Sequence, residues 1–119
     1  MAKTIMVVDD DRGFVSLIES LLKGKGYTVL VANDGEEGIE KAKLHHPHLI
    51  LMDVEMAGMQ GDEAAMLVKA DPATKDIPIL FVTGYRTEQE IKETHEDDII
   101  PKPVHFDQLL SKIKSLIGS

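Results

Sequence analysis

The sequence predicts an α/β domain built around a buried parallel sheet, on three observations. Short runs of apolar, often β-branched residues alternate with segments whose apolar residues recur at helical spacing. The alternation of strand and helix repeats five times, which indicates parallel strands joined by right-handed crossovers, with helices on both faces of the sheet. The 119 residues fit one domain spanning residues 1–119, and 43% of them are hydrophobic, which is enough to form a core.

The predicted strands are apolar on both faces, as buried parallel strands are. They are Thr4–Val8, Thr28–Ala32, residues 49–52 and residues 77–82, with a weaker one at residues 99–100.

The first and last predicted helices carry the clearest apolar stripes. In the first, the stripe consists of Phe14, Leu17, Ile18, Leu21 and Leu22. In the last, it consists of Phe106, Leu109, Leu110, Ile113 and Ile117. Glycines follow both stripes, at Gly24 and Gly26 and at Gly118, and end these helices.

The middle helices have weaker patterns. Residues 35–44 are predicted to form a helix capped by Asn33 or Asp34. Gly61–Ala70 is predicted to form another, with Ala64, Leu67 and Val68 on its buried face. Residues 86–98 contain one large aliphatic residue, Ile91, so a helix there would be held weakly to the core. The acidic residues of this stretch suit a solvated face or, alternatively, a partner-docking surface.

Composition excludes several functions. The net charge of −8 argues against nucleic-acid binding through a basic surface. The sequence contains no cysteine, which excludes disulfides and thiol chemistry and suits a reducing compartment. No apolar run approaches the ~20 residues that span a bilayer. We therefore expect a cytoplasmic protein that binds neither nucleic acid nor membranes.

Polar residues follow the predicted strands at their carboxyl ends, where open parallel sheets bind ligands. The first strand runs into Asp9, Asp10 and Asp11, and the third into Asp53. The fourth meets Thr83 and Gly84, and the fifth is followed by Lys102. Clustered carboxylates repel one another, and a hard divalent cation, Mg²⁺ or alternatively Mn²⁺, would remove that conflict. A hydroxyl, a small glycine and an ammonium facing such a cation suit phosphoryl transfer to a carboxylate.

These residues resemble the receiver domains of two-component response regulators, including the single-domain chemotaxis type. The matching segments are Met6–Asp11, Leu51–Gly61, Phe81–Gly84 and Lys102-Pro103, which occur in order over nearly the whole chain. The resemblance implies a flavodoxin-like, doubly wound (βα)5 three-layer sandwich with strand order 2-1-3-4-5.

The resemblance also implies a role for each site residue. Asp53 accepts a phosphoryl group from the phosphohistidine of a sensor histidine kinase or phosphotransfer protein. Asp9, Asp10, Asp53 and the backbone carbonyl of Glu55 hold Mg²⁺, while Thr83, Gly84 and Lys102 hold the phosphoryl oxygens. The Lys102–Pro103 peptide bond is expected to be cis. Output is expected through a downstream protein target, with a monomer or a weak dimer through the fourth helix, fifth strand and fifth helix.

Three departures from the family pattern concern the switch. Ala57 replaces a usual proline, and Pro101 lies in the short fifth strand. Ile99 replaces the usual aromatic residue that relays the signal to the output face. Glu55 and Tyr85 flank the implied path of the hydrolytic water, and Tyr85 is predicted to cover it in part.

Other interpretations stay open from sequence alone. Asp11 suits a helix N-cap, and Glu55 could be a solvated side chain. His45, His46 and His48 are expected to be solvated residues at a helix end. A receiver-like docking module that is never phosphorylated is one rival function. A phosphatase of the haloacid-dehalogenase type is another, less favoured because Arg12 and Gly13 follow Asp9–Asp11 and no cap segment is evident.

Overall fold

A five-stranded parallel sheet forms the centre of the protein. The computed structural model describes residues 2–85, 87, 89 and 98–118. The strands, in sheet order, are β2 (Thr28–Ala32), β1 (Thr4–Val8), β3 (Leu49–Asp53), β4 (Ile79–Thr83) and β5 (Ile99–Pro101). All four pairings are parallel, so the predicted order 2-1-3-4-5 is confirmed.

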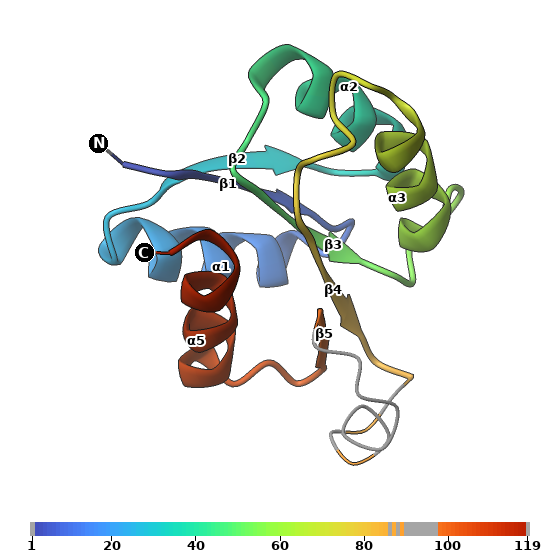
Figure 1. Ribbon diagram of the computed structural model, residues 1–119. Helices are drawn as coiled ribbons and strands as arrows, with labels where there is room; N and C mark the ends of the chain where they lie inside the picture. Colours follow the sequence, from blue (N-terminus) through green and yellow to red (C-terminus); the bar gives the residue numbers. More distant parts are fainter. Residues whose placement is uncertain (1, 86, 88, 90–97, 119) are drawn as a thin grey trace.

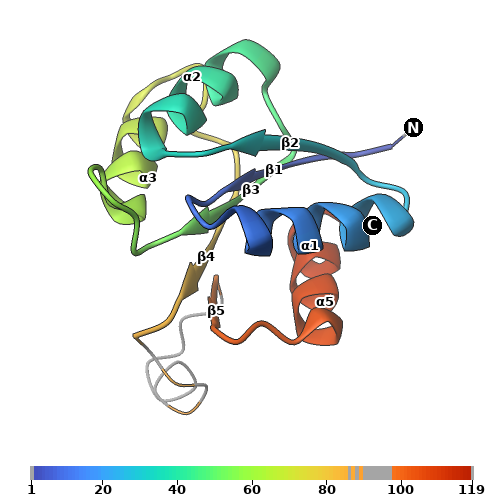
Figure 2. The same ribbon diagram turned by 180° about the vertical axis from the view of Figure 1, so that it is seen from behind.

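Helices cover both faces of this sheet. Figures 1 and 2 show α1 (Arg12–Gly24) and α5 (Phe106–Ile117) on one face, and α2 (Gly35–His45) and α3 (Gly61–Ala70) on the other. Each face buries its own hydrophobic cluster, one against α1 and α5 and the other against α2 and α3. The doubly wound three-layer architecture is therefore as predicted. The helix predicted within residues 86–98 lies outside the described residues, apart from residues 87, 89 and 98.

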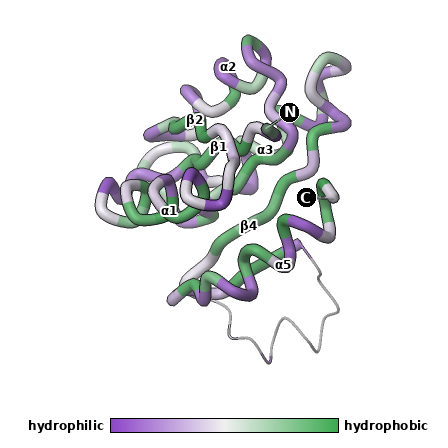
Figure 3. The backbone as a smooth tube through the Cα atoms, turned by 90° about the vertical axis from the view of Figure 1, so that its left-hand side faces the viewer, coloured by the Kyte–Doolittle hydropathy of each residue, from purple (hydrophilic) through white to green (hydrophobic). Residues whose placement is uncertain are grey.

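The central strands are apolar because both of their faces are covered. All five residues of β3 are buried, and four of the five residues of β1 are buried. In Figure 3, β4 is hydrophobic along most of its length, whereas the helices change colour around their turns. The strands thus read as continuous apolar runs, and the helices as amphipathic ones.

Side-chain caps fix where the first two helices begin. The carboxylate of Asp11 accepts hydrogen bonds from the backbone N–H groups of Gly13 and Phe14, and so caps α1. Asp34 caps α2 by accepting from the Glu37 N–H at 2.8 Å. Gly38, a weak helix former, is explained by packing, since a Cβ atom there would lie 3.1 Å from a methyl group of Val8.

Two leucines that were predicted to be buried are instead exposed. In α1 the buried residues are Val15, Ile18 and Leu22, and Leu17 is 58% exposed. In α3, Leu67 is 49% exposed, because the helix packs through its small residues. Those that it buries are Gly61, Ala64, Ala65 and Val68. The prediction chose the buried face of each helix by its large apolar side chains. In the structure, the buried face is the one nearest the sheet, whatever the size of its side chains.

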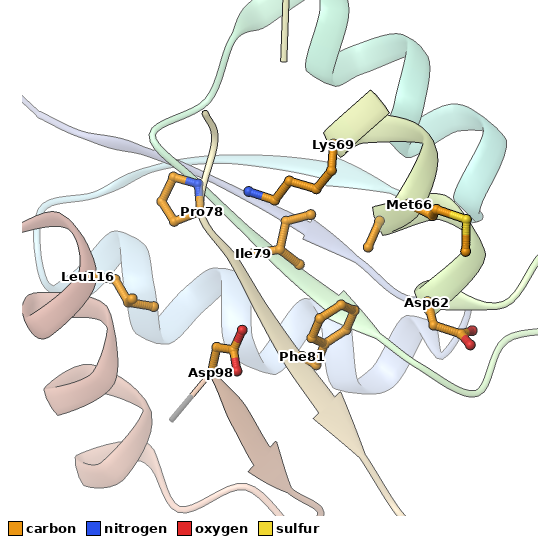
Figure 4. A pocket seen from close by; sticks show the side chains of 9 residues that line it. Asp62, Met66, Lys69, Pro78, Ile79, Phe81, Asp98 and Leu116 are labelled. Carbon is orange, nitrogen blue, oxygen red and sulfur yellow. The ribbon is translucent and has the colours of Figure 1, made fainter. Parts of the chain in front are cut away.

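The far edge of the sheet is short and bordered by α3 and α5. In β5, Ile99 lies opposite Phe81 and Pro101 opposite Thr83. Between the described parts of α3, β4 and α5 lies a pocket of about 300 Å³ (Figure 4), with Phe81, Met66 and Leu116 among its lining residues. Within the part of the chain that the structure describes, no helix has the length and apolar character required to cross a bilayer.

Candidate functional site

The carboxyl ends of four strands bring the predicted polar residues to one edge of the sheet. Asp9 and Asp10 directly follow β1, and Asp53 is the last residue of β3. Thr83 ends β4, and Lys102 directly follows β5. Asp9, Asp53 and Thr83 are almost fully buried, with exposures of 1%, 3% and 4%.

Three carboxylates form a potential cation site. Asp9, Asp10 and Asp53 each offer an oxygen, and the three oxygens lie within 4.8 Å of one another. Backbone groups orient two of these side chains. The Asp11 N–H donates to Oδ1 of Asp9, and the Ala57 N–H donates to Oδ2 of Asp10, both at 2.9 Å.

The ammonium group of Lys102 faces the two buried carboxylates. Its Nζ lies 3.2 Å from Oδ1 of Asp53 and 3.4 Å from Oδ2 of Asp9. The same Nζ lies 4.9 Å from the centre of the Phe14 ring, so the ring of α1 forms one side of the lysine's surroundings. The lysine is thereby held over the reactive end of the sheet.

Burial and charge shift two pKa values at this site. Burial, together with the nearby charge of Asp9, raises the pKa of Asp53 from 3.8 to about 6, although Lys102 acts in the opposite direction. Burial alone would lower the pKa of Lys102, but Asp9 and Asp53 outweigh it and raise that pKa. At neutral pH, the Asp53 carboxyl group is therefore mostly anionic and the Lys102 side chain is a cation.

The residues fit a hard divalent cation. Carboxylate oxygens at the mouth of a buried site are the ligands Mg²⁺ takes, together with water and phosphate oxygens. In addition, Oδ1 of Asp53 is buried and accepts no hydrogen bond from the described residues, its contact with Lys102 being an ion pair. An oxygen in this state has capacity left for a further positive partner.

Glu55 engages the groups that were predicted to hold phosphoryl oxygens. Its Oε2 accepts a hydrogen bond from the Thr83 hydroxyl, and its Oε1 accepts one from the Gly84 N–H, both at 2.7 Å. The Thr83 hydroxyl oxygen in turn accepts from the Tyr85 N–H at 3.1 Å. The half-buried Glu55 carboxylate is thus a specific partner of Thr83 and Gly84.

The backbone around Asp53 depends on Gly61. A Cβ atom at Gly61 would lie 2.0 Å from the carbonyl oxygen of Asp53 and 2.9 Å from Cα of Val54. The Gly61 N–H also donates to the Val54 carbonyl at 2.8 Å. Only a residue without a side chain fits this close approach, which brings the start of α3 against the end of β3.

The remaining predicted residues lie around the site, except for Ile99, which lies at the start of β5. Tyr85 is 83% exposed, and with Gly84 and Lys102 it lines a second pocket of about 350 Å³. Ile99 is half-buried in β5, beside Phe81. The Lys102–Pro103 peptide bond is cis, and the Lys102 N–H donates to the Thr83 carbonyl at 2.8 Å.

Three contributions were not anticipated from sequence. Phe14 was assigned only to the helix core, Gly61 had no assigned role, and the Glu55 side chain was not placed on Thr83. The glycine at a helix start, directly after the loop that follows Asp53, was a detectable signal for close backbone approach. The contacts of Phe14 and Glu55 are long-range, and nothing in the sequence marked them.

Known proteins resemble this chain over nearly its whole length. The sequence profile of the response regulator receiver domain matches residues 5–114. The polar-differentiation response regulator DivK of Brucella ovis is 31% identical over 121 residues, covering 99% of this chain and 98% of that protein.

Solved structures give the same result. A putative response regulator from Chloroflexus aurantiacus superposes with a TM-score of 0.87 at 28% identity, covering all of both chains. The chemotaxis protein CheY4 of Vibrio cholerae superposes with a TM-score of 0.85 at 28% identity, covering 98% of this chain and 99% of that one. The chain therefore belongs to the response regulator receiver domain family, a class of signalling domains in two-component systems.

Proposed function

We propose that this protein is the phosphoacceptor switch of a two-component phosphorelay. Asp53 takes a phosphoryl group from the phosphohistidine of a sensor histidine kinase or phosphotransfer protein, in a reaction that depends on Mg²⁺. Mn²⁺ is the alternative cation. The single observation that carries the proposal is the buried Asp53 carboxylate, 3.2 Å from Lys102 and beside the Asp9–Asp10 pair.

Each site residue has a distinct role in this proposal. Asp9, Asp10, Asp53 and the Glu55 carbonyl would hold Mg²⁺, which would supply positive charge against the phosphoryl oxygens. The Lys102 ammonium supplies a second positive charge beside the acceptor carboxylate. The Thr83 hydroxyl and the Gly84 N–H donate hydrogen bonds to the phosphoryl oxygens, which fixes the orientation of the group.

The transfer needs no general acid or base on this chain. A carboxylate oxygen of Asp53 attacks phosphorus, the P–N bond of the phosphohistidine breaks, and its electron pair returns to the imidazole nitrogen. The product is an aspartyl phosphate. Its slow hydrolysis follows when a water oxygen attacks phosphorus and the bond to the Asp53 oxygen breaks, which restores the carboxylate and releases phosphate. The protein therefore acts as a signalling domain in which the only group modified is its own Asp53.

Output occurs through contacts with a downstream protein. Of the relatives of matching length, one is named a polar-differentiation response regulator and another a chemotaxis protein. The net charge of −8 does not suit a nucleic-acid partner. We place the output face, and any weak dimer, at the predicted fourth helix, β5 and α5. Ile99 lies on that edge, where it substitutes for the expected aromatic relay.

Intact-mass analysis tests the proposal. Incubation with Mg²⁺ and a small acyl phosphate should give one phosphoryl adduct. The adduct should be absent with a chelator and absent in Asp53→Asn. Loss of the adduct in Asp53→Asn but not in Asp11→Asn, a matched change at the α1 cap, would localise it to the acceptor.

Two rival functions predict different results from the same sample. A docking module that is never phosphorylated gives no adduct under any condition, which the close Asp53–Lys102 pair makes less favoured. A phosphatase would hydrolyse a phosphomonoester repeatedly and would depend on Asp9 as its nucleophile. Asp9 is less suited to that role because its Oδ1 already accepts the Asp11 N–H.

A further inference from the structure

The Glu55 side chain occupies both donors that the proposed reaction needs. Its two carboxylate oxygens accept from the Thr83 hydroxyl and the Gly84 N–H at 2.7 Å each, distances typical of strong, charge-assisted hydrogen bonds. A carboxylate spanning these donors presents two anionic oxygens, as a phosphoryl group would.

The two donors cannot serve two anions at once. The Thr83 hydroxyl and the Gly84 N–H can each donate one hydrogen bond, and Glu55 accepts both of these bonds. The Thr83 hydroxyl oxygen is also fixed by the Tyr85 N–H, so its proton can be redirected without moving the hydroxyl itself. A phosphoryl group on Asp53 would therefore compete with Glu55 for these protons.

Charge adds to this competition. A phosphoryl group brings further negative charge into the same volume. Glu55 is half-buried and Gly84 is exposed, so the side chain has a route to solvent.

We propose that Glu55 is an internal anionic competitor, which fills the phosphoryl-oxygen subsite in the unphosphorylated protein and must leave when Asp53 is phosphorylated. This inference rests on the proposed phosphoacceptor function and adds a specificity element to the same site. Glu55 thereby slows phosphorylation of Asp53 and couples that modification to a movement of its own side chain.

The test separates occupancy of the subsite from simple charge. Glu55→Ala removes the carboxylate, whereas Glu55→Asp keeps the charge on a side chain too short to span both donors. Glu63→Gln, an exposed residue in the first turn of α3, is the matched control for loss of one negative charge. Two quantities are measured in Mg²⁺ for each variant. They are the rate of adduct formation from an acyl phosphate, and the affinity for beryllium trifluoride, which binds a carboxylate as a phosphoryl group does.

Release of two charged hydrogen bonds predicts a gain of about tenfold or more in both quantities for Glu55→Ala and Glu55→Asp. Glu63→Gln should stay within about twofold of the wild type. Wild-type values in both Glu55 variants would overturn the inference. So would a gain in Glu55→Ala alone, because that pattern would assign the effect to charge.

Failure of the underlying function gives a different result. If no variant, the wild type included, forms an adduct or binds beryllium trifluoride, the phosphoacceptor proposal itself is wrong. If the wild type forms an adduct on Asp53 at the same rate as the Glu55 variants, only the competitor role is wrong. Thermal unfolding of each variant checks that the fold is kept.

Discussion

The Nζ atom of Lys102, which follows β5, lies 3.2 Å from Oδ1 of Asp53, the last residue of β3. This oxygen is buried and accepts no hydrogen bond from the described residues, so the ion pair is a main source of its stabilisation. The lysine also serves Asp9 at 3.4 Å, and it therefore balances two buried negative charges. Its removal would leave both without that partner.

Lys102→Ala should lower both stability and phosphorylation. With chelator present, we expect the free energy of unfolding to fall by about 2 kcal/mol, because two buried carboxylates lose their cation. Adduct formation with an acyl phosphate should fall by roughly a hundredfold, since the developing charge loses a preorganised partner. Urea unfolding and intact-mass kinetics measure the two effects. Lys25→Ala, an exposed lysine after α1, is the control and should change neither.

Asp53→Asn should stabilise the metal-free protein in a pH-dependent way. The folded pKa of Asp53 is about 6, against an ordinary value of 3.8. Between these values the folded state keeps a proton that the unfolded state has lost, so stability falls as the pH rises through this window. Above this pH window the ionised Asp53 lowers the free energy of unfolding by up to about 3 kcal/mol, and below the window Asp53 does not lower it.

Asparagine cannot ionise, so its advantage should appear only at the higher pH. We expect Asp53→Asn to unfold with a free energy up to about 3 kcal/mol above the wild type near pH 7.5, and to match it near pH 4. Urea titrations with chelator at both pH values measure this. An equal difference in unfolding free energy at the two pH values would show that packing, rather than ionisation, makes Asp53→Asn more stable than the wild type.

Mg²⁺ should stabilise the folded protein through Asp10. A cation that binds only the folded state, at a free concentration a hundred times its Kd, raises the free energy of unfolding by about 2.7 kcal/mol. Asp10→Asn keeps an oxygen for the Ala57 N–H but loses a charged ligand, and should weaken Mg²⁺ binding by roughly tenfold or more. The neighbouring Asp11→Asn removes the same charge from the α1 cap and should leave the Mg²⁺-induced rise in Tm unchanged. An equal loss of Mg²⁺ affinity in both variants would indicate that the total negative charge near the site, rather than coordination by Asp10, attracts the cation.

Tyr85→Ala should shorten the lifetime of the aspartyl phosphate. Tyr85 is 83% exposed, and its backbone N–H donates to the Thr83 hydroxyl oxygen, a hydrogen bond that the substitution keeps. If the ring covers part of the water's path, its removal should speed hydrolysis by a few-fold. The decay of the isolated adduct in Mg²⁺ measures this. An unchanged decay rate would count against the covering role.

The strands and the site acids were predictable because they depend on local patterns. Continuous apolar runs marked β1, β2 and β3, and the residue at each strand end was fixed once the sheet was parallel. The buried faces of α1 and α3 were less predictable. Val15 and Ala65 are buried while Leu17 and Leu67 are exposed, because helix orientation is set by tertiary packing rather than by residue size.

Contacts between distant segments were beyond the sequence argument. The Glu55 side chain bonds to Thr83 across 28 positions, and the Phe14 ring lies against Lys102. Both depend on rotamers that the fold selects after the chain is assembled. The sequence indicated which residue types meet at the sheet edge, and the structure shows which of them already satisfy one another.

Gly61→Ala should disrupt the contact between the start of α3 and the end of β3, and should destabilise the protein more than a substitution at the surface. A Cβ atom would lie 2.0 Å from the Asp53 carbonyl oxygen, so the start of α3 has to move away from β3. We expect a loss of about 3 kcal/mol or more in unfolding free energy. Mg²⁺ binding should fall too, because the Asp53 backbone shifts.

Gly24→Ala is the matched control, since a Cβ atom there meets nothing within 4 Å at the end of α1. Alanine at that position should be neutral or stabilising by up to about 1 kcal/mol, because it lowers the entropy of the unfolded chain. Urea unfolding of the two variants side by side measures the contrast. Equal stabilities would mean that the close approach between α3 and β3 is not required for the stability of the fold.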